Sequence, residues 1–207
     1  IAFFQENTFG SDILNEEGKQ IGHPPIFKFT LAQACGIVGA MQIESGFTLE
    51  PGAWNPAGGG LGARGLVQWR NGGKRLTLVE QFLGKPILVQ NEMDVFAAGY
   101  ASMGRSQRGP VSETRANGVR VGLVNATFED QLTAIREELN GLDIIAARNV
   151  QRLRINTGNG LLDASNTALA WDRFFERSNQ GLRARQQAAT SLFTNFSKAT
   201  QSTGNQQ

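Results

Sequence analysis

Residues 46–73 constrain the fold more than any other part of this sequence, because glycine recurs through them too densely for a long helix or strand. Short apolar pieces lie between the glycines, including Trp54, Leu61 and the run Leu66-Val67-Gln68-Trp69. Glycine supplies the left-handed backbone that tight turns require, so the pattern predicts a small lobe of short strands and turns.

Helical patterns flank this lobe on both sides. Residues 30–44 carry an apolar stripe at helical spacing, with Thr30 as the predicted N-cap and Ser45-Gly46 as the predicted stop. Further apolar faces predict helices over residues 74–83, 93–100, 128–139, 166–177 and 182–196, with Thr127 as the predicted N-cap of the helix over 128–139. We therefore expect an α+β fold that is mostly α, with a helical core and a small β-hairpin lobe.

The ends of the chain differ from its body. Residues 1–27 show no sustained period and contain His23-Pro24-Pro25, so they are interpreted as an N-terminal connector. Residues 197–207 are almost entirely small or polar, which is typical of a tail or linker. The body, residues 28–196, is predicted to be one domain. Within it, residues 84–127 are weakly patterned and carry several arginines, so they are interpreted as an insertion.

Composition excludes several classes of site. The chain has one cysteine, Cys35, and one histidine, His23, which rules out an internal disulfide and argues against a zinc site or a histidine-based triad. Catalysis must then use carboxylates, amides or hydroxyls, and no metal or cofactor is expected. A net charge of +2 argues against nucleic-acid binding through a general positive field. No apolar run is long enough to cross a membrane.

Glu44 is the carboxylate whose position is most unusual. It follows the apolar stripe of the first helix at Ile37 and Met41, at the C-terminal end of that helix. Partial desolvation and the negative end of the helix dipole both favour its protonated form. A carboxylic acid that stays protonated near neutral pH is what general-acid cleavage of a glycosidic bond requires. The alternative, an exposed glutamate that merely ends a helix, remains open at this point.

Two motifs in order resemble a known family. The run Gln42-Ile43-Glu44-Ser45-Gly46-Phe47, followed by Gly65-Leu66-Val67-Gln68-Trp69, is similar to the phage tail lysozyme domain family. It is also similar to the wider lysozyme-like superfamily, which includes goose-type lysozymes and soluble lytic transglycosylases. Two later segments, Phe128-Glu129-Asp130-Gln131-Leu132 and Phe174-Phe175-Glu176-Arg177, fit the same order. The resemblance covers about residues 30–195 and implies a lysozyme-like fold.

The resemblance implies cleavage of the β-1,4 bond between N-acetylmuramic acid and N-acetylglucosamine in peptidoglycan, with Glu44 as the general acid. A hydrolase of this kind needs a second group, for which Glu50 and Glu176 are the candidates. Each candidate also has a non-catalytic interpretation: Glu50 as an exposed turn residue, and Glu176 as part of a structural ion pair or cap. A lytic transglycosylase needs no second carboxylate, because the 6-hydroxyl of the substrate closes a 1,6-anhydro ring, so that chemistry also remains open.

Polar and aromatic residues near Glu44 are the candidates for substrate contact. Gln68 is expected to orient water or an acetamido group, and tryptophan rings can stack on sugars. The full set of predicted substrate-binding residues is Ser45, Trp54, Asn55, Gln68 and Trp69. Trp54 and Trp69 are equally well explained as core residues of the small lobe.

The expected partners are peptidoglycan glycan strands and other phage tail or virion proteins. The sequence shows no signal-peptide pattern and does not begin with Met, which suits a piece of a larger tail or injected protein that acts on the host wall. Two other hypotheses remain open. The protein could be a lysozyme-fold module that binds glycan or docks without catalysis, or an unrelated helical virion protein in which the Glu-Ser motif occurs by chance.

Overall fold

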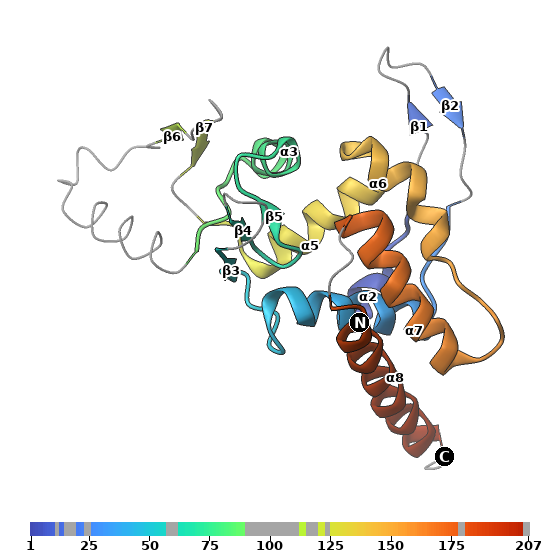
Figure 1. Ribbon diagram of the computed structural model, residues 1–207. Coiled ribbons are helices and arrows are strands. Elements are labelled where there is room, and N and C mark those ends of the chain that lie inside the picture. Colours follow the sequence, from blue (N-terminus) through green and yellow to red (C-terminus); the bar gives the residue numbers. More distant parts are fainter. Residues whose placement is uncertain are drawn as a thin grey trace. The chain divides into compact units, whose positions relative to one another are not determined.

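The computed structural model describes residues 1–10, 13–14, 20–22, 26–56, 62–89, 112–114, 120–122, 125–177 and 181–204. They fall into two compact units (Figure 1). Unit 1 joins Ile1–Ile43 with Glu138–Gln207, and unit 2 is the continuous segment Glu44–Glu137. The chain is mostly helical with a small antiparallel sheet, which confirms the predicted fold class.

Unit 1 is the helical part of the protein. Its elements are α1 (Ala2–Glu6), β1 (Ile13–Leu14), β2 (Gln20–Gly22), most of α2 (Leu31–Ser45), η3 (Glu138–Leu142), α6 (Ile144–Asn149), η4 (Val150–Leu153), α7 (Gly160–Trp171), η5 (Asp172–Glu176) and α8 (Leu182–Gly204). The helices α7 and α8 lie side by side (Figure 1).

Helix α2 packs closely against α7 and α8 through two glycines. A Cβ on Gly36 would lie 2.6 Å from the Thr167 side chain, and one on Gly39 would lie 2.5 Å from the Ala189 backbone nitrogen. Between these glycines the helix is buried all round, as is typical of a central helix. Cys35 is fully buried, so it acts as a small apolar residue of the core, and its desolvation raises the pKa of the thiol to about 11.

Aromatic side chains form a second part of the unit 1 core. Phe4 and Phe9 are fully buried, and the Phe9 ring lies 4.8 Å from that of Phe29, while Phe4 meets Trp171 edge-on at 6.3 Å. Phe4 and Phe9 therefore belong to the core of unit 1, within the stretch 1–27 that was interpreted from the sequence as a connector. Irregularly spaced phenylalanines give no period in the sequence, so their burial depends on packing partners far along the chain.

Unit 2 contains the predicted glycine-rich lobe. Its elements are β3 (Trp54–Asn55), β4 (Ala63–Arg64), β5 (Trp69–Arg70), α3 (Lys74–Leu83), β6 (Ser112–Thr114), β7 (Arg120–Gly122) and α5 (Phe128–Glu137). The strands β3, β4 and β5 form an antiparallel sheet in that order, with Trp54 opposite Arg64 and Arg64 opposite Trp69. The short strands β6 and β7 form a separate antiparallel pair inside the predicted insertion.

Most predicted helices are present, with some changes at their ends. The helix predicted over 74–83 coincides with α3, and that over 30–44 differs from α2 by one residue at each end. The helix predicted from 166 begins earlier, at Gly160, because the Asn159 side chain caps it, and α8 runs on to Gly204. The helix predicted over 93–100 lies outside the described residues, and the domain boundaries remain predictions. Within the described ranges, every helix is too short or too polar to span a bilayer.

Candidate active site

Glu44 is the next-to-last residue of α2. The helix is buried from Ala32 to Met41, becomes half-buried at Glu44, and ends with Ser45, which is only 3% exposed. Gly46 follows in the left-handed region, with φ of 86°, which stops the helix. The Glu44 carboxyl is therefore partly desolvated at the negative end of a helix, as the sequence predicted.

A tight turn leads from Glu44 into the lobe. The Glu50 amide donates to the Ser45 carbonyl at 3.0 Å, and the Leu49 amide to the Gly46 carbonyl at 2.9 Å. Glu50 itself is exposed, and its carboxylate accepts a hydrogen bond from the Thr48 hydroxyl at 2.6 Å. These contacts fit the non-catalytic interpretation of Glu50, in which it is a residue of an exposed turn.

The two tryptophans of the sheet differ in their surroundings. Trp54 is 43% exposed on β3, and the Arg64 guanidinium lies 5.5 Å from its ring centroid. Asn55, next to it, is also exposed. Trp69 on β5 is only 1% exposed, and its ring would lie 2.9 Å from a Cβ on Gly65. Of the two rings, Trp54 can offer a face to a sugar, whereas Trp69 packs in the lobe.

Gln68 lies in the turn between β4 and β5 with a left-handed backbone, φ of 50°. Its side-chain NH₂ donates to the Gly65 carbonyl at 3.1 Å and more weakly to the Ala53 carbonyl at 3.5 Å. The Gln68 Oε1 is buried and has no hydrogen-bond partner among the described residues. The Gln68 NH₂ group thus links this turn to Ala53, the residue before Trp54. The Gln68 Oε1 can accept a hydrogen bond from a further donor.

Gln131 on α5 is a site residue that the sequence analysis did not single out. Its side chain is fully buried. The amide oxygen accepts from the Leu66 N–H at 2.9 Å, and the amide nitrogen donates to the Pro51 carbonyl at 2.8 Å. One side chain therefore holds both the loop after Glu44 and the turn that carries Gln68. A polar residue on the apolar face of α5 was the available signal.

Glu176 belongs to unit 1, at the end of η5. Both of its carboxylate oxygens are engaged: the Trp171 indole N–H donates to Oε1 at 2.7 Å, and Arg185 donates to Oε2 at 2.9 Å. Arg185 also lies 3.1 Å from Asp172, and burial lowers the pKa of its guanidinium. This arrangement matches the predicted structural ion pair and holds the Glu176 carboxyl group in one orientation.

Comparison with known proteins adds one finding. A family model described as phage tail lysozyme matches residues 26–196, which is most of the chain. No curated protein and no solved structure matches it.

Proposed function

Because this chain belongs to the phage tail lysozyme family, we propose that it is a muramidase of a phage tail or virion, with Glu44 as its general acid. Membership indicates, more coarsely, a phage-associated enzyme of lysozyme fold that degrades peptidoglycan. The proposed reaction is cleavage of the β-1,4 bond between N-acetylmuramic acid and N-acetylglucosamine during entry through the host wall. Other tail or virion proteins are its proposed partners.

The observation that carries the proposal is the position of Glu44. It lies half-buried at the C-terminal end of α2, inside the region that the family model matches, and the turn into the lobe follows directly. Partial burial and the helix dipole both favour the neutral carboxyl, which can protonate the leaving oxygen of a glycosidic bond.

The lobe supplies the proposed contacts to the sugars. Trp54 offers an exposed ring for stacking, and Asn55 beside it offers an amide. Gln68 lies in a turn that its own amide nitrogen holds in place, and because its Oε1 is buried, we propose that it shapes the site from beneath. Ser45 and Trp69 are both almost fully buried, so we propose that they act by supporting the site.

Whether a second catalytic carboxylate is present distinguishes hydrolysis from lytic transglycosylation. Glu50 is exposed in a turn, and both oxygens of Glu176 are already hydrogen-bonded within unit 1. These engagements favour a mechanism with one carboxylate, so lytic transglycosylation with Glu44 as acid and then base is the second candidate function. In the hydrolytic alternative, Glu176 is the better proposed partner of the two, because Trp171 and Arg185 hold its carboxyl group in place.

The test is the release of muropeptides from purified peptidoglycan sacculi. Glu44→Gln keeps the size of the side chain and removes the proton, so we expect the turnover rate to fall by roughly 10²-fold or more. Glu50→Gln is the matched control, since it makes the same change at an exposed turn, and we expect it to retain nearly full activity. Equal activity of Glu44→Gln and wild type would overturn the assignment of the acid.

Mass analysis of the same products separates the two chemistries. Reducing ends indicate hydrolysis, and 1,6-anhydro ends indicate transglycosylation. Hydrolysis combined with a large loss in Glu176→Gln would assign Glu176 as the second group. If the folded wild-type protein binds sacculi but releases nothing, the non-catalytic glycan-binding module replaces the enzyme.

A further inference from the structure

In the described part of unit 1, the exposed charged side chains are mostly basic. Among the residues of this unit whose side chains are described, the exposed acidic residue is Glu6. The exposed basic residues are Lys28, Arg148, Arg152, Arg154, Arg173, Arg177, Arg183 and Lys198. The small net charge of +2 for the whole chain therefore does not describe the exposed charges in the described part of unit 1, which are mostly positive.

Four of the described acidic residues of unit 1 make contacts within the fold. Asp143 caps α6 by accepting from the Ile145 N–H at 2.9 Å, and Asp163 accepts from both the amide and the hydroxyl of Thr157 at 2.7 Å. Asp172 and Glu176 face the buried Arg185. These carboxylates are engaged in caps and ion pairs within the fold, and Asp143 also pairs with the exposed Arg177.

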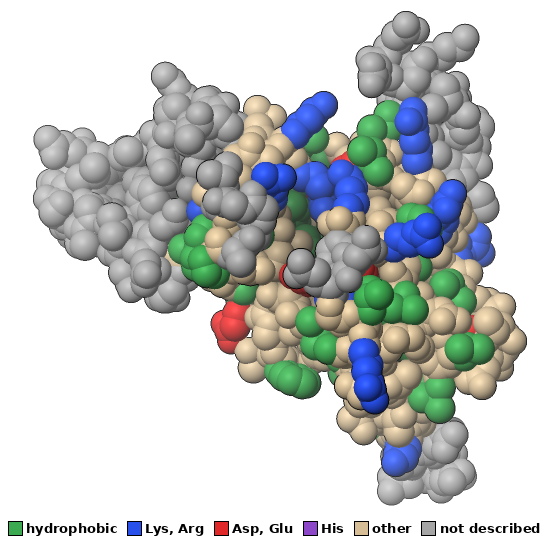
Figure 2. Space-filling model, viewed as in Figure 1, with side chains coloured by type: hydrophobic (Ala, Val, Ile, Leu, Met, Phe, Trp, Pro, Cys, Tyr) green, Lys and Arg blue, Asp and Glu red, His purple; other side chains and the backbone are tan. Residues whose placement is uncertain are grey.

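Five of the exposed arginines lie on one set of adjoining elements. The segments α6, η4 and η5 lie against one another, and Arg148, Arg152, Arg154, Arg173 and Arg177 lie on them or directly after them. We call these five residues the basic face. Lys and Arg side chains gather over this part of unit 1 in the space-filling view (Figure 2).

Two members of the basic face share one aromatic ring. The guanidinium of Arg152 lies 4.7 Å from the ring centroid of Phe174, and that of Arg173 lies 5.4 Å from it. Arg177 is held differently, by an ion pair with Asp143. Stacking on an aromatic ring restricts a guanidinium without using its N–H donors, so Arg152 and Arg173 remain available to an anion.

We infer that the basic face binds the free carboxylates of peptidoglycan stem peptides, and so holds the enzyme on the wall polymer that it cleaves. This inference rests on the proposed function for its choice of polymer. Guanidinium groups pair with carboxylates through parallel N–H···O bonds, and a wall strand presents carboxylates repeatedly along its length. Repeated weak contacts of this kind raise the local concentration of substrate and speed its encounter.

The experiment measures co-sedimentation with sacculi in the Glu44→Gln background, in which the wall is not consumed. The test variant adds Arg148→Gln, Arg152→Gln and Arg173→Gln. A matched control adds Lys28→Gln, Arg183→Gln and Lys198→Gln, which removes the same charge from exposed positions outside the basic face. A second probe is sacculi whose carboxylates have been converted to neutral amides with a carbodiimide and an amine, which keep the sugars and the peptides and lack the negative charges.

We expect the test variant to bind sacculi about tenfold more weakly than the control, with the difference shrinking at high salt. On the amidated sacculi the two variants should bind alike. The inference is overturned if the control loses as much binding as the test variant, or if the loss is equally large on amidated sacculi. It is also overturned if the test variant binds sacculi as well as the parent, or if the face selects anionic lipid vesicles or duplex DNA over sacculi.

Failure of the proposed function gives a different result. A wild-type protein that cleaves no sacculi, together with arginine-dependent binding in the Glu44→Gln background, would refute the enzyme and leave the basic face intact. Cleavage by wild type with no selective loss in the test variant would refute the basic face and leave the enzyme intact.

Discussion

At the scale of single residues, Gln131 shows how one buried amide organises a lobe that has little regular structure. It accepts from the Leu66 N–H and donates to the Pro51 carbonyl, so it joins the turn that carries Gln68 to the loop after Glu44. Gly65 permits this arrangement, since a Cβ there would lie 2.7 Å from the Gln131 Oε1. Short strands supply few backbone hydrogen bonds, so side-chain bonds determine the shape of the lobe.

We predict that Gln131→Met weakens both stability and substrate binding. The substitution keeps the length of the side chain and leaves a buried N–H and a buried carbonyl without partners, which costs about 1–3 kcal/mol. Because the affected loops carry Trp54 and Gln68, KM should rise more than kcat falls. Unfolding by urea and cleavage kinetics, both measured where the variant is folded, provide the two readouts.

Gln33→Met is the matched control for this prediction. Gln33 in unit 1 is also nearly buried, donates to the Ile155 carbonyl at 2.9 Å and accepts from the Thr30 N–H at 3.0 Å. Its loss should lower stability by a similar amount while KM stays near the wild-type value. If both variants change KM equally, Gln131 has a purely structural role.

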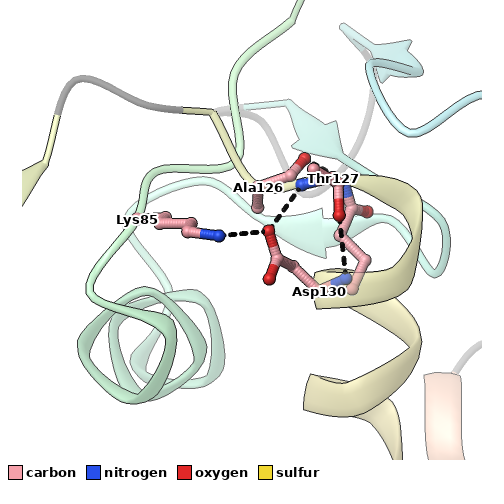
Figure 3. A network of polar contacts seen from close by, with 5 residues as sticks. Lys85, Ala126, Thr127 and Asp130 are labelled. Atoms are coloured by element: carbon pink, nitrogen blue, oxygen red, sulfur yellow. Dashed lines mark hydrogen bonds and ion pairs between the residues drawn. The ribbon is translucent and has the colours of Figure 1, made fainter.

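At the scale of elements, reciprocal caps fix where two helices begin. Thr30 and Gln33 exchange hydrogen bonds at the start of α2, and Thr127 and Asp130 do the same at the start of α5. Lys85 adds an ion pair to Asp130 at 2.7 Å (Figure 3). The sequence analysis predicted both threonine caps, because a threonine before an apolar stripe is a local signal that needs no tertiary contact.

The second cap makes stability depend on pH. The hydrogen bond from Lys85 lowers the pKa of Asp130 below its usual value, with a further contribution from the Thr127 amide. The stabilisation is present above the unfolded pKa, about 3.9, and is lost as the pH falls through the lower folded pKa. Asp130→Asn should therefore be less stable than wild type at pH 6, by about 1 kcal/mol, and nearly equal to it at the lowest pH.

Urea unfolding at a series of pH values between 6 and 2 checks this prediction. Glu129→Gln serves as the control, because it removes a charge from the same first turn without touching Lys85. A stability difference between Asp130→Asn and wild type that does not change with pH would show that the ion pair contributes nothing.

At the scale of the whole molecule, unit 1 is built from both ends of the chain, and unit 2 is the segment between them. Glycine permits the packing inside unit 1 where α2 meets α7 and α8, since Cβ atoms at Gly36 and Gly39 would overlap those helices. Packing between residues so far apart in sequence makes the early and late parts of the chain depend on each other for stability.

We predict that Gly39→Ala destabilises unit 1 by roughly 1–3 kcal/mol or more, because the added Cβ meets the backbone of Ala189, which cannot rotate away. Gly160→Ala is the matched control. Its added Cβ meets the end of the Phe193 side chain, which can move, and alanine favours the helix. Denaturant midpoints should fall clearly for the first variant and little for the second. Equal midpoints would show that α2 and α8 are not in close contact.

Features that depend on a local sequence pattern could be predicted from the sequence. They are the helices α2 and α3, the caps at Thr30 and Thr127, the glycine-rich lobe and the family. A helix needs a repeated apolar spacing, a cap needs one polar residue before it, and a turn needs glycine. Glu44 was identified in the same way, from its place at the end of an apolar stripe, and its catalytic role remains a prediction.

Other features have no local sequence pattern and are determined only by tertiary packing. The burial of Phe4 and Phe9, the hydrogen bonds of Gln131 and the exposure of Trp54 relative to Trp69 all depend on residues distant in the sequence. The basic face exists because carboxylates that balance the arginines in the composition are buried in caps and ion pairs. Composition fixes the net charge of the protein, but only folding determines which charges reach the solvent.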